Sequence, residues 1–223
     1  MLDPSALTTY VLIAATVITS LMAFSNPAWL QEYVLDVQAV RRGEHVRLLT
    51  SGFLHADGAH LAVNMFSLFF FGALLERVAG PAVLLAVYFG AIVGGGLLAL
   101  VLHRKEDYRA LGASGGVCGV IFAAIFFAPG TAVFIFPIPV PIPSWLYAIL
   151  FVAYSVYGAK VQRDNVGHDA HLGGALVGLG IATLFAPAIA LHNPLLYGAI
   201  VLGGIGAMVY LGWGPGGKRT DAS

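Results

Sequence analysis

Residues 58–103 read GAHLAVNMFSLFFFGALLERVAGPAVLLAVYFGAIVGGGLLALVLH, and this stretch decides the fold. It contains two apolar runs, about 58–75 and 81–103, which are separated only by ERVAGP. An α-helix needs about 20 mostly apolar residues to cross the hydrocarbon layer of a bilayer, because each residue rises about 1.5 Å. The two runs and the short break between them therefore predict a tight antiparallel pair of membrane-spanning helices.

The composition of the whole chain agrees with a membrane location. Of 223 residues, 59% are hydrophobic and 10% are charged, and the mean hydropathy is +0.86. Soluble domains carry about 25% charged residues, so a soluble globular domain is excluded. The formal net charge is +0, which gives no indication of nucleic-acid binding. Cys118 is the single cysteine, so an internal disulfide is impossible.

Five further apolar runs extend the pattern outward from residues 58–103. The first lacks a basic segment before it and is long enough to span, so we interpret it as a retained helix and not a cleaved signal peptide. We expect helices at about 7–25, 58–75, 81–103, 113–128, 144–160, 168–186 and 195–213. The sequence thus predicts an all-α polytopic membrane protein with six helices within residues 1–190, a seventh within 191–213 and a mobile tail at 214–223.

Two connections are too long or too irregular to be simple turns. The polar insertion at 26–57 is expected to fold on or in the membrane interface. The segment 129–143, PGTAVFIFPIPVPIP, is apolar but broken repeatedly by proline, which favours a re-entrant or interfacial turn.

Glycines recur four residues apart in three of the predicted helices. Small residues at this spacing let helix backbones approach closely in lipid, where helices associate largely through van der Waals contact. Ordinary helix packing is the common explanation for any one such pair. The pairs are Gly90 and Gly94, Gly115 and Gly119, and Gly174 and Gly178.

Four polar side chains lie within the predicted spans, near the N-terminal ends of the second, fourth and sixth helices. His60 and Asn64 are four apart and share a helix face, Ser114 opens the fourth helix, and His171 lies in the first turns of the sixth. Alternate helices cross the membrane in the same direction. His60, Ser114 and His171 are therefore expected at similar shallow depth in one leaflet. All four polar side chains are expected to point into the bundle, because unpaired polar groups in hydrocarbon are costly.

This combination predicts nucleophilic catalysis. A serine hydroxyl needs a base to take its proton, and neutral histidine is the usual base. A tetrahedral intermediate also needs hydrogen-bond donors, which the Ser114 N–H in the first turn of a helix, His60 and Asn64 can supply. Gly112 and Gly115 would keep the approach to the Ser114 hydroxyl open.

Structural explanations remain open for the same residues. Ser114 among glycines is often only a packing residue, and His60 with Asn64 can form an interhelical hydrogen-bond pair. His168, Asp169 and His171 are spaced as possible metal ligands. The chain has neither an HExxH motif nor another inward His or Cys cluster, so no metal or other cofactor is expected.

Taken together, the motifs resemble the rhomboid family of intramembrane serine proteases. The matching residues are the HxxxN of His60–Asn64, the GxSG of residues 112–115, and the AHxxGxxxG that runs from Ala170 to Gly178. RLLTSGFLHADGAHLAVNMFS, LLERVAG with Glu76, and FPIPVPIPSW also look rhomboid-like. The resemblance covers about residues 40–190.

The resemblance implies an activity. Ser114 would be the nucleophile and His171 the general base of a Ser-His dyad, and His60 with Asn64 would form the oxyanion site. Gly112, Gly115, Gly174 and Gly178 would support the helix packing. Residues 1–190 would form the catalytic core, and the substrates would be membrane proteins cut in or beside a transmembrane helix in the lipid bilayer.

The chain departs from the family at two positions. Cys118 stands where many members carry an aromatic residue that packs against the catalytic histidine, and Val46-Arg47 replaces a Trp-Arg pair. Neither change removes a reacting atom. A non-catalytic rhomboid-like factor that binds or routes transmembrane clients is the alternative function, and a small-solute transporter is a more distant one.

The membrane orientation is contested between two signals. The resemblance implies a multi-pass protein of a prokaryotic plasma membrane, with the site open to the extracytoplasmic side. The positive-inside rule places that side in the cytoplasm, because ten of eleven basic residues fall on it and only Arg77 lies opposite. The ten are Arg41, Arg42, Arg47, Arg104, Lys105, Arg109, Lys160, Arg163, Lys218 and Arg219.

Overall fold

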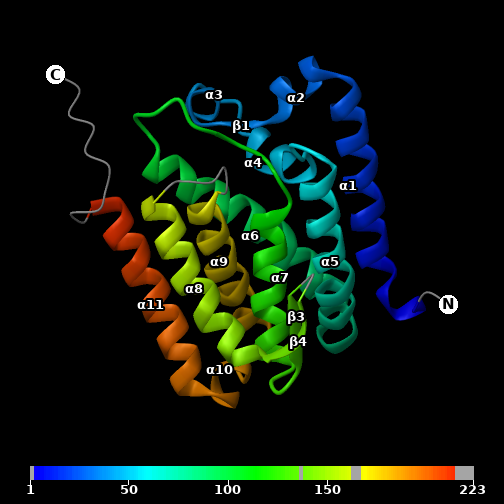
Figure 1. Ribbon diagram of the computed structural model, residues 1–223, viewed down its shortest axis with the longest axis vertical. Coiled ribbons are helices and arrows are strands. Elements are labelled where there is room, and N and C mark those ends of the chain that lie inside the picture. Colours follow the sequence, from blue (N-terminus) through cyan, green and yellow to red (C-terminus); the bar gives the residue numbers. More distant parts are fainter. Residues whose placement is uncertain (1–2, 136–137, 162–166, 214–223) are drawn as a thin grey trace.

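The computed structural model describes residues 3–135, 138–161 and 167–213, and it shows a bundle of long helices lying side by side (Figure 1). α1 lies at one side of the bundle, α11 at the other, and α7 between them. The long helices are α1 (Leu7–Ser25), α5 (Gly58–Ala79), α6 (Pro81–Leu102), α7 (Ser114–Phe127), α8 (Ser144–Val161), α9 (His168–Phe185) and α11 (Pro194–Trp213). The predicted all-α polytopic fold of six helices followed by a seventh is confirmed. The predicted tail at 214–223 lies outside the described residues.

The helices differ in their capacity to cross a bilayer alone. Four of the described helices are long and apolar enough to span, namely those at Pro4–Ser25, Gly58–Ala79, Pro81–Leu102 and Pro194–Leu211. α7 has 14 residues, or about 21 Å at 1.5 Å per residue, which is less than the hydrocarbon thickness of about 30 Å. At least one end of α7 therefore lies within the thickness of the membrane.

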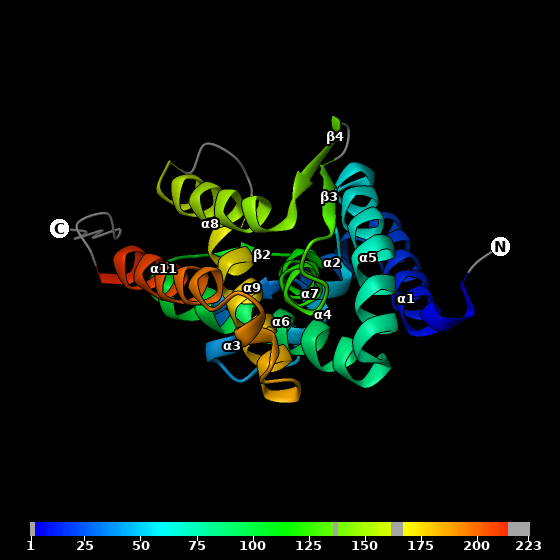
Figure 2. The ribbon, with the colours of Figure 1, turned by 90° about the horizontal axis from the view of Figure 1, so that it is seen from below.

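α7 is the centre of the core. Every residue from Gly115 to Phe126 is buried, as expected for a helix that is apolar on all sides. Viewed from below, other helices surround α7 (Figure 2). α5, α6 and α9 all pack against it. Ser114, as the first residue of this helix, is therefore placed inside the bundle by the packing of everything that follows it.

The break between the second and third predicted helices is shorter than expected. The residues ERVA of ERVAGP continue α5 to Ala79, and the chain reverses at Gly80, whose φ of 87° suits glycine, before Pro81 opens α6. The extension positions Glu76 at the start of α1. Its carboxylate accepts hydrogen bonds from the N–H groups of Thr8 and Thr9, 2.9 and 2.8 Å away, which have no partner within α1.

The insertion at 26–57 folds into short elements, and its location at the membrane interface stays a prediction. The short elements are α2 (Pro27–Tyr33), β1 (Leu35–Asp36), α3 (Val37–Arg41), α4 (Arg47–Thr50) and a 3₁₀ turn (Ser51–Phe53). β1 pairs in antiparallel fashion with β2 (Arg109–Ala110), which lies between α6 and α7. This pairing attaches the insertion to the segment that leads into Ser114.

The proline-rich segment, which was expected to be a re-entrant or interfacial turn, contains a pair of antiparallel strands. β3 (Ala132–Ile135) pairs with β4 (Ile138–Pro143), with Ala132 opposite Pro143 and Val133 opposite Ile142. Prolines occupy alternate positions of β4, and successive N–H groups point to opposite edges of a strand. The prolines therefore remove donors from one edge only, so the other edge can still pair.

Candidate active site

Glycines bring α7 and α9 into backbone contact. A Cβ atom added to Gly174 would collide with the backbone of Gly115, and one added to Gly178 would collide with the backbone of Gly119. No side chain on these two positions of α9 can be accommodated without moving a helix. The predicted packing glycines Gly115, Gly174 and Gly178 thus meet at one interface, whereas Gly90 and Gly94 receive Ile181 and Val177 of α9 on α6.

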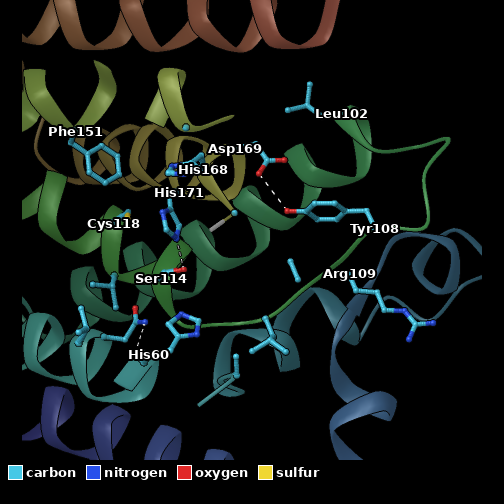
Figure 3. Close-up of a pocket in the computed structure, with 18 of the residues that line it drawn as sticks. His60, Leu102, Tyr108, Arg109, Ser114, Cys118, Phe151, His168, Asp169 and His171 are labelled. Atoms are coloured by element: carbon cyan, nitrogen blue, oxygen red, sulfur yellow. Dashed lines mark hydrogen bonds between the residues drawn. The ribbon is translucent and has the colours of Figure 1, made fainter. Parts of the chain in front are cut away.

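This contact aligns Ser114 with His171. The Ser114 Oγ lies 2.6 Å from the His171 Nε2, a hydrogen-bond distance, and both side chains are half-buried (Figure 3). With a neutral imidazole, the serine hydroxyl donates to Nε2. Ser114 also has a backbone N–H in the first turn of α7, where an N–H has no carbonyl to bond within the helix. The structure therefore brings together a hydroxyl that can act as a nucleophile and an imidazole that can act as a base, although Ser114 and His171 are 57 residues apart in the sequence.

His60 and Asn64 line the same cavity as Ser114. The Asn64 side-chain amide donates to the His60 carbonyl oxygen at 3.0 Å, one turn earlier in α5. The His60 ring lies beside Gly112: a Cβ at residue 112 would be 2.8 Å from its Cε1 and 3.5 Å from the Ser114 Oγ. The space left by Gly112 therefore separates the imidazole from the hydroxyl.

Gly112 was expected to support helix packing, but it is a loop residue. It precedes α7, has a φ of 132°, and donates its N–H to the Ser51 carbonyl at 3.0 Å. A side chain would be strained by this φ and would meet the His60 ring. Gly112 thus sets the path of the chain into Ser114.

His55 is a site residue that the sequence analysis did not assign. Its side chain is fully buried, its Nε2 accepts the N–H of Ala113 at 3.3 Å, and its Nδ1 lies 2.9 Å from the Ser20 Oγ. Burial, and then the neighbouring His60, lowers the pKa of His55 to about 4, so the ring is neutral near pH 7. The Ser20 hydroxyl donates to the Phe53 carbonyl at 2.9 Å, so the His55 Nδ1 carries the proton and Nε2 is the acceptor.

His55 thereby holds the peptide that directly precedes Ser114. The only signal for it in the sequence was its place in the loop before His60, and the two rings are 4.8 Å apart. It lies outside the apolar runs, so its burial could not be read from periodicity.

Cys118 lines the cavity together with Tyr147 and Phe151 of α8. A thiol has no ring to pack on His171. The His168 ring contacts the His171 ring, with centroids 6.2 Å apart. His168 in turn packs edge-on against Tyr154 of α8 at 5.0 Å. The orientation of His171 is thus supported from its own helix.

The residues considered as metal ligands separate in the structure. Asp169 turns away from His168 and His171 and approaches His103 at the end of α6, with its Oδ2 2.6 Å from the His103 Nε2. Within the described part of the chain, no three His, Cys, Asp or Glu side chains converge as metal ligands do.

Ser114, His171, His60 and Asn64 line one cavity of about 960 Å³. Its lining also includes apolar side chains of α7 and α8 and polar side chains of the loop between α6 and β2. Figure 3 shows Ser114 and His171 between Cys118 and Phe151 on one side and Tyr108 and Arg109 on the other. The geometry can hold an extended peptide segment against a hydroxyl with a base beside it.

Comparison with known proteins identifies the family. The Rhomboid domain matches residues 42–188. The chain is 28% identical over 170 residues to RHOMBOID-like protein 12, mitochondrial, of Arabidopsis thaliana, covering 69% of this chain and 50% of that protein. It is 28% identical over 155 residues to Rhomboid protein 1, mitochondrial, of Saccharomyces cerevisiae, covering 68% and 44%. It is 28% identical over 165 residues to the Rhomboid protease GluP of Bacillus subtilis, covering 73% and 31%.

The chain spans about half the length of the first two curated relatives, and less of the third. The match covers well over half of this chain, from the insertion after α1 to the end of α9. The chain is a multi-pass membrane protein, and it belongs to the rhomboid family.

Proposed function

We propose that the chain is an intramembrane serine endopeptidase that cleaves peptide bonds in or beside the transmembrane segments of other membrane proteins. The observation that carries the proposal is the 2.6 Å contact between the Ser114 Oγ and the His171 Nε2 inside a cavity of the bundle. Relatives include proteins named as rhomboid proteases, GluP and AarA. A packing serine would have no need of a histidine at this distance.

The first half of the reaction is acyl transfer to Ser114. The Oγ attacks the substrate carbonyl carbon while the His171 Nε2 takes the hydroxyl proton. The tetrahedral intermediate collapses when the carbon–nitrogen bond breaks, and His171 gives the proton to the leaving amine. The products are an ester on Ser114 and the C-terminal fragment of the substrate with a free amino group.

The second half returns the enzyme to its starting state. His171 takes a proton from a water molecule, and the resulting hydroxide adds to the ester carbonyl. The carbon–Oγ bond breaks, the proton passes to Oγ, and the N-terminal fragment leaves with a carboxyl group. No cofactor is needed to balance the reaction.

The negative charge on the intermediate requires donors next to Ser114. We assign this role to the Ser114 backbone N–H, the His60 ring and the Asn64 amide, which all border the cavity at the nucleophile. Preorganised donors in a water-poor site are usually the largest single contribution to catalysis of this kind. His55 and Gly112 position the chain that presents the N–H.

The substrate class follows from the location of the site. A peptide bond can reach Ser114 only if its backbone is extended, because a helical carbonyl is already hydrogen-bonded and covered by side chains. The substrate is therefore a transmembrane segment that unwinds locally, and it enters from the bilayer. The alternative of a non-catalytic client-binding factor gives no account of the contact between Ser114 and His171.

The side of the membrane on which the cavity opens stays a prediction. Arg41 donates to the Arg104 carbonyl, and Arg47 donates to the carbonyls of Gln31 and Val34 at 2.8 and 3.0 Å. Arg47 thus holds the insertion together and Arg41 ties it to the loop after α6, so both are weak topology signals. The relatives come from mitochondria, chloroplasts and bacteria, so the prokaryotic plasma membrane is likewise a prediction from the sequence alone.

The proposal is tested by replacing the two reacting side chains. Ser114→Ala and His171→Ala in the full chain should each abolish cleavage of a model transmembrane substrate in detergent, and labelling by a fluorophosphonate probe should be lost as well. Ser67→Ala is the matched control, because Ser67 borders the same cavity but donates to the Val63 carbonyl of its own helix at 2.9 Å. Wild-type protein that is folded yet neither labels nor cleaves would refute the proposal.

A further inference from the structure

A buried polar cluster joins the end of α6 to the first turn of α9. The His103 Nε2 lies 2.6 Å from the Asp169 Oδ2, and its Nδ1 lies 2.8 Å from the Glu106 Oε2. Both His103 and Asp169 are 7% exposed. The Tyr108 ring stacks on His103 with centroids 3.8 Å apart and planes 8° from parallel. The imidazole is thus fixed on both ring nitrogens and on one face.

The two carboxylates determine the protonation state of His103. A neutral imidazole donates through one nitrogen only, whereas here both nitrogens face carboxylate oxygens at hydrogen-bond distance. The ring is therefore an imidazolium that donates to both. Burial opposes this charge, but the hydrogen bonds to Asp169 and Glu106 outweigh burial and raise the pKa of His103 above its ordinary value. Charged hydrogen bonds of this length are the strong ones.

The loop that carries His103 is anchored independently of α9. Gln38 of α3 donates to the Glu106 carbonyl at 2.9 Å, and Arg41 donates to the Arg104 carbonyl. β2 pairs with β1 immediately afterwards. The contacts with α3 and β1 therefore fix the loop that carries His103, and through its hydrogen bond His103 can hold Asp169 in place.

Asp169 lies two residues before His171 in the same first turn. The α6 and α9 backbones also touch there, since a Cβ on Gly95 would be 2.6 Å from the Ala170 carbonyl oxygen. The first turn of a helix is its least supported part, because its N–H groups lack internal partners. A contact that fixes Asp169 thus fixes the direction from which the His171 ring leaves the helix.

We propose that His103 is a positioning residue for His171: it grips Asp169 and so holds the first turn of α9 where the His171 Nε2 meets the Ser114 Oγ. This inference rests on the proposed function, since it concerns the geometry of the reacting pair. His103, Asp169 and Tyr108 line the cavity that contains Ser114, and Figure 3 shows Asp169 and Tyr108 to one side of the Ser114–His171 pair.

The contact between His103 and Asp169 weakens as the pH rises. Since the folded pKa of His103 is raised, its stabilising contribution is complete below the ordinary histidine value and is lost as the pH rises through the folded pKa. The titratable or charged groups around the cluster are Asp169 and Glu106 in direct contact, Tyr108 on the ring face, Arg41 on α3, Arg104, Lys105, Asp107 and Arg109 on the loop, and His168 and His171 on α9.

The test compares His103→Gln with His45→Gln in the full chain in detergent. Gln keeps one donor toward Asp169 but cannot titrate, and His45 is an exposed histidine of the insertion that serves as the control. The rate of fluorophosphonate labelling is measured from pH 6 to 10. His103→Gln should lower the rate about 10-fold or more, because a displacement of about 1 Å at a reacting group costs about 10²-fold.

The pH profile separates positioning from general structural damage. Wild type and His45→Gln should lose labelling at the alkaline end, and His103→Gln should lack this alkaline fall. In Asp169→Asn, which serves even where His103→Gln does not fold, the alkaline fall should move to lower pH. In the double variant the loss should equal the larger single loss, since both changes break one link.

Three results have distinct meanings. His103→Gln that labels like His45→Gln at every pH overturns the inference. A lower rate with an unchanged alkaline fall also overturns it, because His103 is then merely structural. Wild type that does not label at all refutes the proposed function instead.

Discussion

The two sides of the cavity are built in opposite ways. On one side, α7 and α9 meet backbone to backbone through Gly174 and Gly178, and α7 is buried along its length. On the other side, α5 and α8 line the cavity with side chains such as Val63 and Phe151. Figure 2 shows α8 set apart from α5, with the β3–β4 hairpin between them.

The two sides differ in how much displacement their contacts can tolerate. Two backbones in contact have no rotamers to change, so a displacement of one moves the other. α5 and α8 instead carry many exposed large apolar residues, which are Val63, Phe66, Phe69, Phe70, Val78, Trp145, Ile149, Leu150, Tyr154 and Tyr157. Side chains at such a surface can repack. The Ser114–His171 pair thus lies on the rigid side, and under the proposed function a substrate segment would enter on the adaptable side.

The largest effect is expected from breaking the rigid side. Gly174→Ala places a methyl group against the Gly115 backbone and pushes α9 away from α7, so labelling of Ser114 should fall to background. Gly180→Ala is the matched control on the same helix, since Gly180 is exposed and has nothing within 4 Å of the added atom. Labelling kinetics and thermal unfolding in detergent measure both. Equal labelling in the two variants would show that the contact between α7 and α9 is not rigid.

A smaller effect is expected from the donors, which border the cavity without setting the helix contact. Asn64→Asp keeps the size of the side chain but removes its N–H donors, so kcat for a transmembrane substrate should fall by roughly 10²–10³-fold if the amide stabilises the oxyanion. KM should change little, because the donor acts on the transition state. A raised KM with an unaltered kcat would assign Asn64 to substrate binding instead.

The smallest effect is expected on the adaptable side. Phe151 is half-buried and packs edge-on against Phe122 of α7, with centroids 5.1 Å apart. Phe151→Ala should change fluorophosphonate labelling by less than about threefold, because neighbouring side chains can repack around the gap. The dyad contact does not pass through this residue. A loss comparable to that of Gly174→Ala would remove the distinction between the two sides.

Much of this architecture was readable from the sequence. Six of the seven predicted spans end within three residues of the observed helices, since hydrocarbon demands long apolar runs and glycine or proline marks their ends. α5 alone runs four residues further, because Glu, Arg, Val and Ala can all continue a helix and only Gly80 reverses the chain. The parity of the helices also placed Ser114 and His171 at one end of the bundle, and the two side chains do meet. Their catalytic roles, and those of His60 and Asn64, stay predictions.

The rest depended on the tertiary structure. The proline pattern of residues 138–143 is compatible with a turn or a strand, and only pairing with β3 selects the strand. His55 lies just outside the apolar runs and His103 is the last residue of one, so no periodicity marks either side chain as buried.

The sequence by itself determined which segments cross the membrane and which residue types stand near the same end of alternate helices, because these follow from local apolar length and direction. Only the tertiary structure decided that Gly112 turns the chain, that His55 holds the peptide before Ser114, and that His103 grips Asp169, 66 residues away. The physical reason is that a hydrogen bond requires its two atoms within about 3 Å. That precision arises from how glycine-lined helices pack, and no spacing along the chain encodes it.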